Sequence, residues 1–188
     1  MLILKIEDVF ISEDKENWGV ALSQYKELYY EKQSSYTAIH FAFLCWYILW
    51  QWDEISFRGE SLTPYEKPIT DTRCGISRNE LFDDLEMLSR NLLNTKNEIE
   101  IKYLMVLCHM KQTYSYFFEE EVFSERDCQQ IKKQISMHPF NETGMKVLCT
   151  YLHTKCAYKV TLEERMAVHN LFPMHSLMQT YFDWLFDR

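Results

Sequence analysis

The sequence predicts an all-α protein, on the basis of three observations. Glycine and proline are scarce, with 4 residues of each in a chain of 188. Sandwiches, barrels and phosphate-binding α/β folds need more turn glycines than this, so helices with short connections are favoured. Apolar side chains recur at spacings of three and four along most of the chain, which is the period of a helix. Several of these runs begin with Ser or Thr and an acidic residue three positions later, a signal typical of helix N-termini.

The size and composition of the chain predict one domain. A hydrophobic fraction of 47% and an aromatic fraction of 15% are typical of globular proteins and exclude general disorder. A chain of this length can bury one substantial core and is too short to expect two. We therefore predict a single helical domain over residues 1–188, and the connection over residues 57–76 is the one place at which it could divide.

The first elements are an ambiguous segment and an amphipathic helix. Leu2, Leu4 and Ile6 alternate as in a strand, but a single strand without a partner is implausible, so the conformation of residues 2–6 is left open. Between residues 16 and 31, apolar side chains recur with helical period at Trp18, Ala21, Leu22, Tyr25, Leu28 and Tyr29. This pattern predicts a helix that packs one face on a neighbour.

The next helix is the predicted centre of the fold. Residues 40–52, HFAFLCWYILWQW, contain no charged side chain, and on a helical wheel apolar residues cover most of the circumference. Helices of this kind are buried with neighbours on several sides, and the apolar part is too short for a membrane span of about 20 residues. We therefore predict a buried central helix over residues of about 35–55. Its one polar stripe consists of Gln33, Tyr36, His40, Tyr47 and Gln51.

The second half of the chain carries the clearest helix starts. The capping signals are Ser77 with Glu80, Thr95 with Glu98, Ser124 with Asp127, and Thr161 with Glu164. An apolar run of helical period follows these signals, and a last run lies beyond residue 173. The whole pattern predicts about eight helices in an irregular bundle or an array of helical hairpins.

A long connection over residues 57–76 separates the two halves. It holds two of the four glycines and two of the four prolines. A loop of this length inside a compact domain is usually functional or mobile, and the alternative is a surface crossover between two helical parts. Both interpretations stay open, and Tyr65 and Arg73 are the candidate partner contacts in this segment.

The charge balance points to a basic partner. Asp and Glu number 28 against 20 Lys and Arg, for a formal net charge of −8. Such a surface repels nucleic-acid phosphates and anionic lipids and attracts basic proteins. Two acidic clusters are the candidate contacts, namely Asp83, Asp84 and Glu86 in one and Glu119, Glu120 and Glu121 in the other. The alternative is that both clusters are solvated helix ends.

One set of residues has the spacing of a metal site. Cys149, His153 and Cys156 fall at positions i, i+4 and i+7 of a predicted helix, and zinc accepts such ligands. The two cysteines also lie in the apolar stripe of that helix, and free cysteine is among the most buried residue types. Core packing is the favoured interpretation, so we predict no catalytic residue, no metal and no cofactor.

The six cysteines and the first residues predict a cytoplasmic protein. The beginning of the chain lacks the basic region and the small-residue cleavage site of a secretory signal, and reduced thiols are expected in the cytosol. The leading functional hypothesis is an acidic protein-binding module, for example an inhibitor or immunity protein that neutralises a basic, nuclease-type toxin. The alternatives are a helical adaptor that binds a peptide in a groove, with contacts from the polar stripe, and a small helical enzyme or metal protein. The oligomeric state is left open.

Overall fold

The computed structural model describes residues 4–57, 76–154 and 160–187, and the regular structure within these ranges is entirely helical. The all-α prediction is therefore confirmed. The elements are α1 (Ile6–Asp14), α2 (Trp18–Glu31), α3 (Ser35–Trp50), α4 (Trp52–Phe57), α5 (Arg78–Asn94), α6 (Ile101–Thr113), the 3₁₀ helix η2 (Ser115–Phe117), α7 (Glu125–Ser136), α8 (Thr143–Thr154), α9 (Leu162–His169) and α10 (Leu177–Phe186).

Helix α3 is the centre of the core, as predicted. Leu44, Cys45 and Trp46, three consecutive residues that point to different sides of the helix, are all completely buried. Helices α2, α5, α6 and α10 pack around α3, which explains why its sequence is apolar on nearly every face. The helix ends earlier than expected, because the backbone at Gln51 leaves the helical region and α4 begins after it. Within the described ranges, no helix has the length and apolar character that a bilayer crossing requires.

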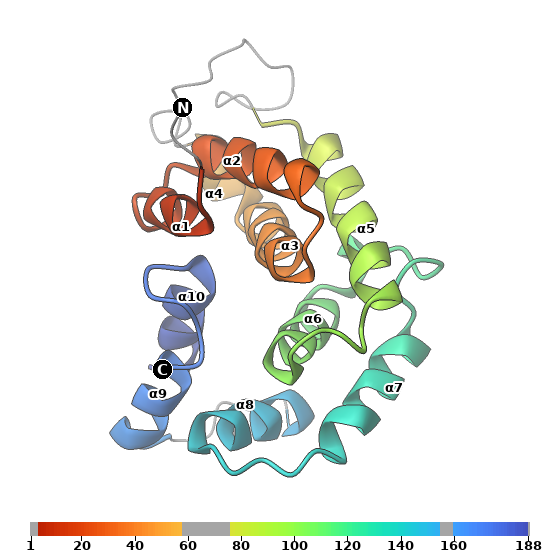
Figure 1. Ribbon diagram of the computed structural model, residues 1–188, viewed down its shortest axis with the longest axis vertical. Helices are drawn as coiled ribbons and strands as arrows, with labels where there is room; N and C mark the ends of the chain where they lie inside the picture. The colour runs from red at the N-terminus through yellow and green to blue at the C-terminus, as the bar shows by residue number, and fades with distance from the viewer. Residues whose placement is uncertain (1–3, 58–75, 155–159, 188) are drawn as a thin grey trace.

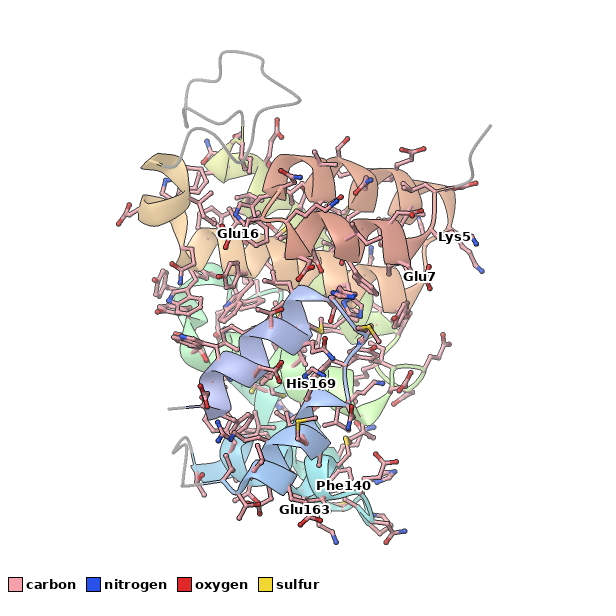
Figure 2. All side chains as sticks on the ribbon, turned by 90° about the vertical axis from the view of Figure 1, so that its left-hand side faces the viewer. Lys5, Glu7, Glu16, Phe140, Glu163 and His169 are labelled. Atoms are coloured by element: carbon pink, nitrogen blue, oxygen red, sulfur yellow. The ribbon has the colours of Figure 1, made fainter. Side chains whose placement is uncertain are left out.

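The other helices surround α3 and α6 (Figure 1). Helices that are close in the chain are in contact with one another, namely α1 with α2, α2 with α3, and α3 with α5. Helix α6 then contacts α7 and α8, and α8 pairs with α9. Helix α10 finally returns to contact both α1 and α3, so that segments from the two ends of the chain lie side by side (Figure 2).

Three of the four predicted caps are confirmed. Ser77, Ser124 and Thr161 each accept a hydrogen bond from the backbone N–H three residues later. The prediction for Thr95 was wrong. Helix α5 continues to Asn94, so Thr95 is the residue that ends it, and its hydroxyl donates to the Asn91 carbonyl at 3.0 Å.

The ambiguous N-terminal segment is helical from Ile6 onward. Lys5 precedes the helix in an extended conformation, and its backbone N–H donates to the carboxylate of Asp8 at 2.9 Å. This bond satisfies a backbone group that has no partner within the helix. Helix α1 therefore provides a second layer over α2, with no need for a partner strand.

Candidate functional site

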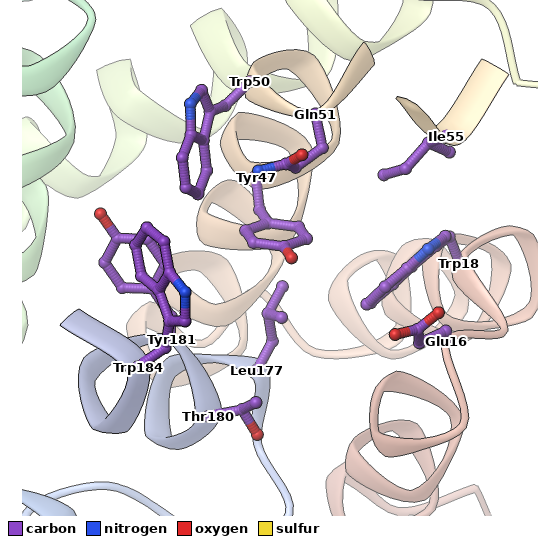
Figure 3. Close-up of a pocket in the computed structure, with 10 residues that line it drawn as sticks. All are labelled: Glu16, Trp18, Tyr47, Trp50, Gln51, Ile55, Leu177, Thr180, Tyr181 and Trp184. Atoms are coloured by element: carbon purple, nitrogen blue, oxygen red, sulfur yellow. The ribbon is translucent and has the colours of Figure 1, made fainter. Parts of the chain in front are cut away.

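A cleft of about 350 Å³ lies between the corner that joins α1 to α2, the end of α3 and one face of α10 (Figure 3). Half of the described residues that line it are aromatic. The lining consists of Glu16, Trp18, Tyr47, Trp50, Gln51, Ile55, Leu177, Thr180, Tyr181 and Trp184. We call this site the aromatic cleft.

Helical spacing places the aromatic side chains. Tyr47 and Trp50 are three residues apart on the last turn of α3, and Tyr181 and Trp184 have the same spacing on α10, so each pair shares one face of its helix. The two pairs meet, since the ring centroid of Trp50 lies 5.7 Å from Tyr181 and 5.8 Å from Trp184. Trp18, at the start of α2, contacts Tyr47 at 5.7 Å. Trp184 remains 42% exposed, which leaves part of this wall open to a ligand.

Glu16 is the one charged residue among the described residues that line the cleft. Figure 3 shows its carboxylate on the same side of the cleft as Trp18, away from Tyr181 and Trp184. Its backbone has a φ of 55°, in the left-handed region that usually requires glycine.

The left-handed backbone at Glu16 follows from the way α1 ends. The N–H of Glu16 donates to the Glu13 carbonyl, and the N–H of Asn17 donates to the Ser12 carbonyl, both at 2.9 Å. This pair of bonds is the Schellman motif, in which the residue after the helix adopts a left-handed conformation. A residue other than glycine costs about 1 kcal/mol there. The chain therefore holds a carboxylate at the cleft at some cost in stability.

A buried, neutral histidine lies behind Tyr181. The hydroxyl of Tyr181 lies 2.8 Å from Nε2 of His109, and it points away from the cleft (Figure 3). Burial lowers the pKa of His109 to about 4, so the imidazole is uncharged at neutral pH. The ring of Tyr181 therefore lines the cleft, while its hydroxyl is the hydrogen-bond partner of the buried His109 imidazole.

The side chains of the lining bear on the kind of ligand that the cleft could hold. The described residues of the lining include no thiol and no imidazole that could act as a nucleophile or base. They offer aromatic faces and one carboxylate. This combination attracts an organic cation, because the negative face of an aromatic ring and a carboxylate both favour positive charge.

The polar stripe predicted on the central helix is not one groove. His40 is only 2% exposed and packs against Phe10, Tyr36 and Tyr103. The burial lowers its pKa to about 3. Tyr47 and Gln51 line the aromatic cleft, whereas Gln33 and Tyr36 lie at the other end of α3. The structure therefore brings two of the five stripe residues to a common site.

The first acidic cluster is partly neutralised within the chain. Asp83 is exposed, whereas Asp84 pairs with Lys26 at 2.9 Å. Glu86 pairs with Arg90 at 2.8 Å. Burial raises the pKa of Asp84, which is typical of a carboxylate that has left water. Asp83 is thus the member of this cluster that stays most available to a partner.

The second acidic cluster contains one residue with a structural role. Glu120 pairs with the buried Lys111 at 3.1 Å and accepts the backbone N–H of Glu125 at 2.7 Å. The N–H bond to Glu125 and the pair with Lys111 lower the pKa of Glu120. Glu119 and Glu121 are exposed on either side of it.

Two of the three predicted metal ligands lie together. Sγ of Cys149 is 3.7 Å from Nδ1 of His153, while Nε2 of His153 lies 2.9 Å from the Ser136 hydroxyl. Over residues 4–57, 76–154 and 160–187, no group of three or more His, Cys, Asp or Glu side chains is arranged to hold a metal ion. Cys156, and the predicted partner contacts Tyr65 and Arg73, lie outside the described residues.

The aromatic cleft itself was missed by reasoning from the sequence. Trp18 and Tyr47 were assigned to a helix face, and Glu16 was an unremarked acid before a helix. The signal that was present is an acidic residue two positions before a tryptophan that begins a helix. Comparison with protein-family models, with curated proteins and with solved structures gives no match to this chain.

Proposed function

We propose that this protein is a binding module for a basic partner protein and that the aromatic cleft receives an arginine side chain of that partner. The observation that carries the proposal is the combination of five aromatic side chains with Glu16 as the single charged group in the described lining. The net charge of −8 supports it, because an acidic surface raises the rate at which a basic protein associates.

Arginine fits this cleft better than lysine. The guanidinium group is planar, stacks on aromatic faces and can donate two parallel hydrogen bonds to a carboxylate. Each cation–π contact contributes about 0.5–2 kcal/mol, depending on how far water is excluded. A buried Trp18 and a partly exposed Trp184 provide both kinds of environment within one cleft.

The wider surface would supply the rest of the affinity. A single side chain cannot hold a protein tightly, and a stable complex buries roughly 1,600 Å² in all. Asp83, Glu119 and Glu121 are exposed acids that remain candidates for the rim of that interface. Inhibition of a basic, nuclease-type toxin in the cytoplasm is a role that this chemistry suits.

The test compares two small probes of almost equal shape. N-acetyl-argininamide carries the guanidinium charge, and N-acetyl-citrullinamide replaces that group by a neutral urea. Tryptophan fluorescence, or the indole N–H signals in NMR, would follow the titration. A ligand of about 15 non-hydrogen atoms at about −0.3 kcal/mol per atom should bind with a Kd in the millimolar range.

A matched pair of variants tests whether the carboxylate of Glu16 is the group that attracts the guanidinium. Glu16→Gln should weaken binding of the arginine probe about fivefold, since an exposed ion pair contributes about 1 kcal/mol. Glu7→Gln removes an exposed acid of α1 that is not part of the described cleft lining, and it should leave the affinity unchanged. Equal binding of the arginine and citrulline probes, or an arginine titration that leaves the tryptophans undisturbed, would refute the proposal.

A further inference from the structure

A buried carboxylate joins the two walls of the aromatic cleft. Glu13, on the last turn of α1, is 3% exposed. Its Oε1 accepts a hydrogen bond from the Tyr25 hydroxyl at 2.9 Å, and its Oε2 accepts the backbone N–H of Leu177 at 2.8 Å. Leu177 is the first residue of α10, so one side chain connects α1, α2 and α10.

One end of this connection lines the cleft, and the other end lies close to it in the chain. Glu16 lies three residues after Glu13 and lines one side, whereas Leu177 lines the other side with its side chain. The bond between Glu13 and Leu177 therefore links the elements that carry the two walls. We call the contact of α1 with α10 around Glu13 the seam, and Figure 2 shows the two helices side by side with Glu16 at the end of α1.

The seam also contains the strained backbone of the described chain. Glu16, with φ of 55°, and His175, with φ of 65°, are the residues other than glycine that have a positive φ in the described ranges. His175 immediately precedes the cap of α10, and its Nδ1 lies 3.4 Å from the Asp14 carboxylate. Strain of this kind persists where the surroundings enforce it, and it concentrates at ligand-binding and switching elements.

The surroundings of Glu13 oppose its charge. Its two hydrogen-bond donors are a hydroxyl and a backbone N–H, neither of which carries a positive charge. Tyr25 from α2 contacts it directly, with Tyr36 and Cys45 of α3 beyond Tyr25. The other ionisable groups of the seam are Asp14 at the end of α1, Glu16 in the corner after α1, and His175 in the segment before α10. Burial outweighs the hydrogen bonds and raises the pKa of Glu13 to about 8.

We propose that Glu13 is a positioning residue that makes cation binding in the aromatic cleft depend on pH. When Glu13 is ionised, the positive end of the α10 dipole and the Leu177 N–H attract its carboxylate more strongly, and this draws the cleft walls together even though burial of the charge lowers the stability of the fold as a whole. The negative charge behind the cleft then lacks a cationic partner, and a bound guanidinium supplies one. Affinity for the cation should therefore rise as Glu13 loses its proton, and by reciprocity binding should release a proton.

This inference rests on the proposed function, and its test uses the same probe. The guanidinium of N-acetyl-argininamide stays charged over the whole range, so the ligand itself contributes no pH dependence. For the unmodified protein, we expect the affinity measured by tryptophan fluorescence to rise about fivefold between pH 6 and pH 9.5, the lower end of usual coupling between sites. Calorimetry in two buffers of different ionisation enthalpy should show proton release on binding near pH 8.

Two variants separate positioning by Glu13 from a merely structural role. Glu13→Gln imitates the protonated side chain, so its affinity should stay at the low-pH level at every pH. Tyr25→Phe keeps the carboxylate but removes one donor to its charged form, so the midpoint of the pH profile should move upward. The second variant provides the test even if the first does not fold, as judged by near-ultraviolet circular dichroism.

A third variant controls for the neighbouring imidazole. His175→Asn keeps a residue that tolerates a left-handed backbone and removes the titrating ring, and it should retain the rise in affinity. Loss of the rise in this variant, or its persistence in Glu13→Gln, overturns the inference. Binding that is independent of pH in the unmodified protein overturns the role of Glu13 alone. Absence of binding at every pH overturns the proposed function and the role of Glu13 together.

Discussion

The middle of α3 and the seam between α1 and α10 are both buried, but they are built in different ways. Around Phe41 the structure is held by packing of apolar side chains, with Tyr25 stacked on its ring at 5.7 Å. At the seam a buried carboxylate accepts a hydrogen bond from a buried hydroxyl, and two exposed residues with left-handed backbone lie beside them. The first region is stabilised mainly by apolar packing, whereas the second departs from the usual rules of backbone conformation and charge burial beside the cleft. Departures of this kind are expected where a protein binds a ligand.

The largest effect should come from the packed region. Phe41→Ala removes a completely buried ring and should lower the free energy of unfolding by about 3–5 kcal/mol, which approaches the total stability of a domain of this size. Denaturant titration would measure the change. Tyr30→Ala, at a side chain that is 61% exposed, is the control and should stay within about 0.5 kcal/mol of the unmodified protein. A similar cost at both positions would show that α3 is not the centre of the core.

The seam should respond to pH instead. Glu13 has a pKa of about 8 in the folded protein and an ordinary value of 4.5 when exposed, so the folded state binds the proton more strongly. The stability it contributes is complete below pH 4.5 and is lost as the pH rises to about 8, by an amount on the order of a few kcal/mol.

Chemical unfolding at a series of pH values would measure this loss. In Glu13→Gln most of the decline between pH 5 and pH 8 should disappear, because the neutral amide does not titrate. Phe41→Ala should lower the whole curve without changing its slope. If the slope survives in Glu13→Gln, another group in the protein causes it.

A packing effect of intermediate size is expected where α8 meets α9. A Cβ atom at Gly144 would overlap the carbonyl oxygen of Ala167 and lie 3.1 Å from Cγ of Leu171. Gly144→Ala should therefore destabilise the protein by about 1–3 kcal/mol, although alanine normally stabilises a helix relative to glycine. Thermal unfolding would measure it. A stabilised Gly144→Ala would mean that the two helices can separate at low cost.

A smaller effect of opposite sign is expected at the strained end of α1. Glu16→Gly relieves the left-handed backbone and should stabilise the protein by about 1 kcal/mol, while it weakens binding of the arginine probe as much as Glu16→Gln does. Denaturant titration and fluorescence would be measured on the same samples. A loss of stability in Glu16→Gly would show that the carboxylate contributes more to folding than its backbone costs.

The smallest effect on stability is expected at the exposed acids. Replacement of Glu119 and Glu121 together by Gln, which keeps the ion pair of Glu120 with the buried Lys111, should change stability by less than about 1 kcal/mol and slow the association of a basic partner. Association of that partner should also fall steeply with salt. Stopped-flow measurement at several salt concentrations would test both points. A rate that is indifferent to salt and to these changes would show that the cluster is a solvated surface and leave the aromatic cleft as the contact.

The sequence predicted what depends on local pattern. The burial of α3 follows from the absence of charge over residues 40–52, and the caps at Ser124 and Thr161 follow from short motifs. The cap at Thr95 failed because the same motif can lie at the end of a preceding helix. The end of α3 at Gln51 could not be predicted from the sequence, since nothing in the glutamine side chain disfavours a helix.

The aromatic cleft could not be predicted, because its walls are distant in sequence. Glu13 and Leu177 are 164 positions apart, and no local pattern indicates that they meet. The left-handed backbone at Glu16 was equally hidden, since its residue type favours an ordinary helix. A sequence shows which side chains prefer burial. Which of these side chains face the same cleft depends on how α10 packs against α1.

The bond between Glu13 and Leu177 also sets an order of events during synthesis. The ribosome makes the 164 residues that separate them in roughly 10–30 s. Throughout this interval Glu13 has no α10 to hold, and Trp18, Tyr47 and Trp50 lack the wall that Tyr181 and Trp184 later provide. Until α10 arrives, the nascent chain therefore lacks the cover for an aromatic surface beside an acidic group, which is the kind of surface that chaperones recognise.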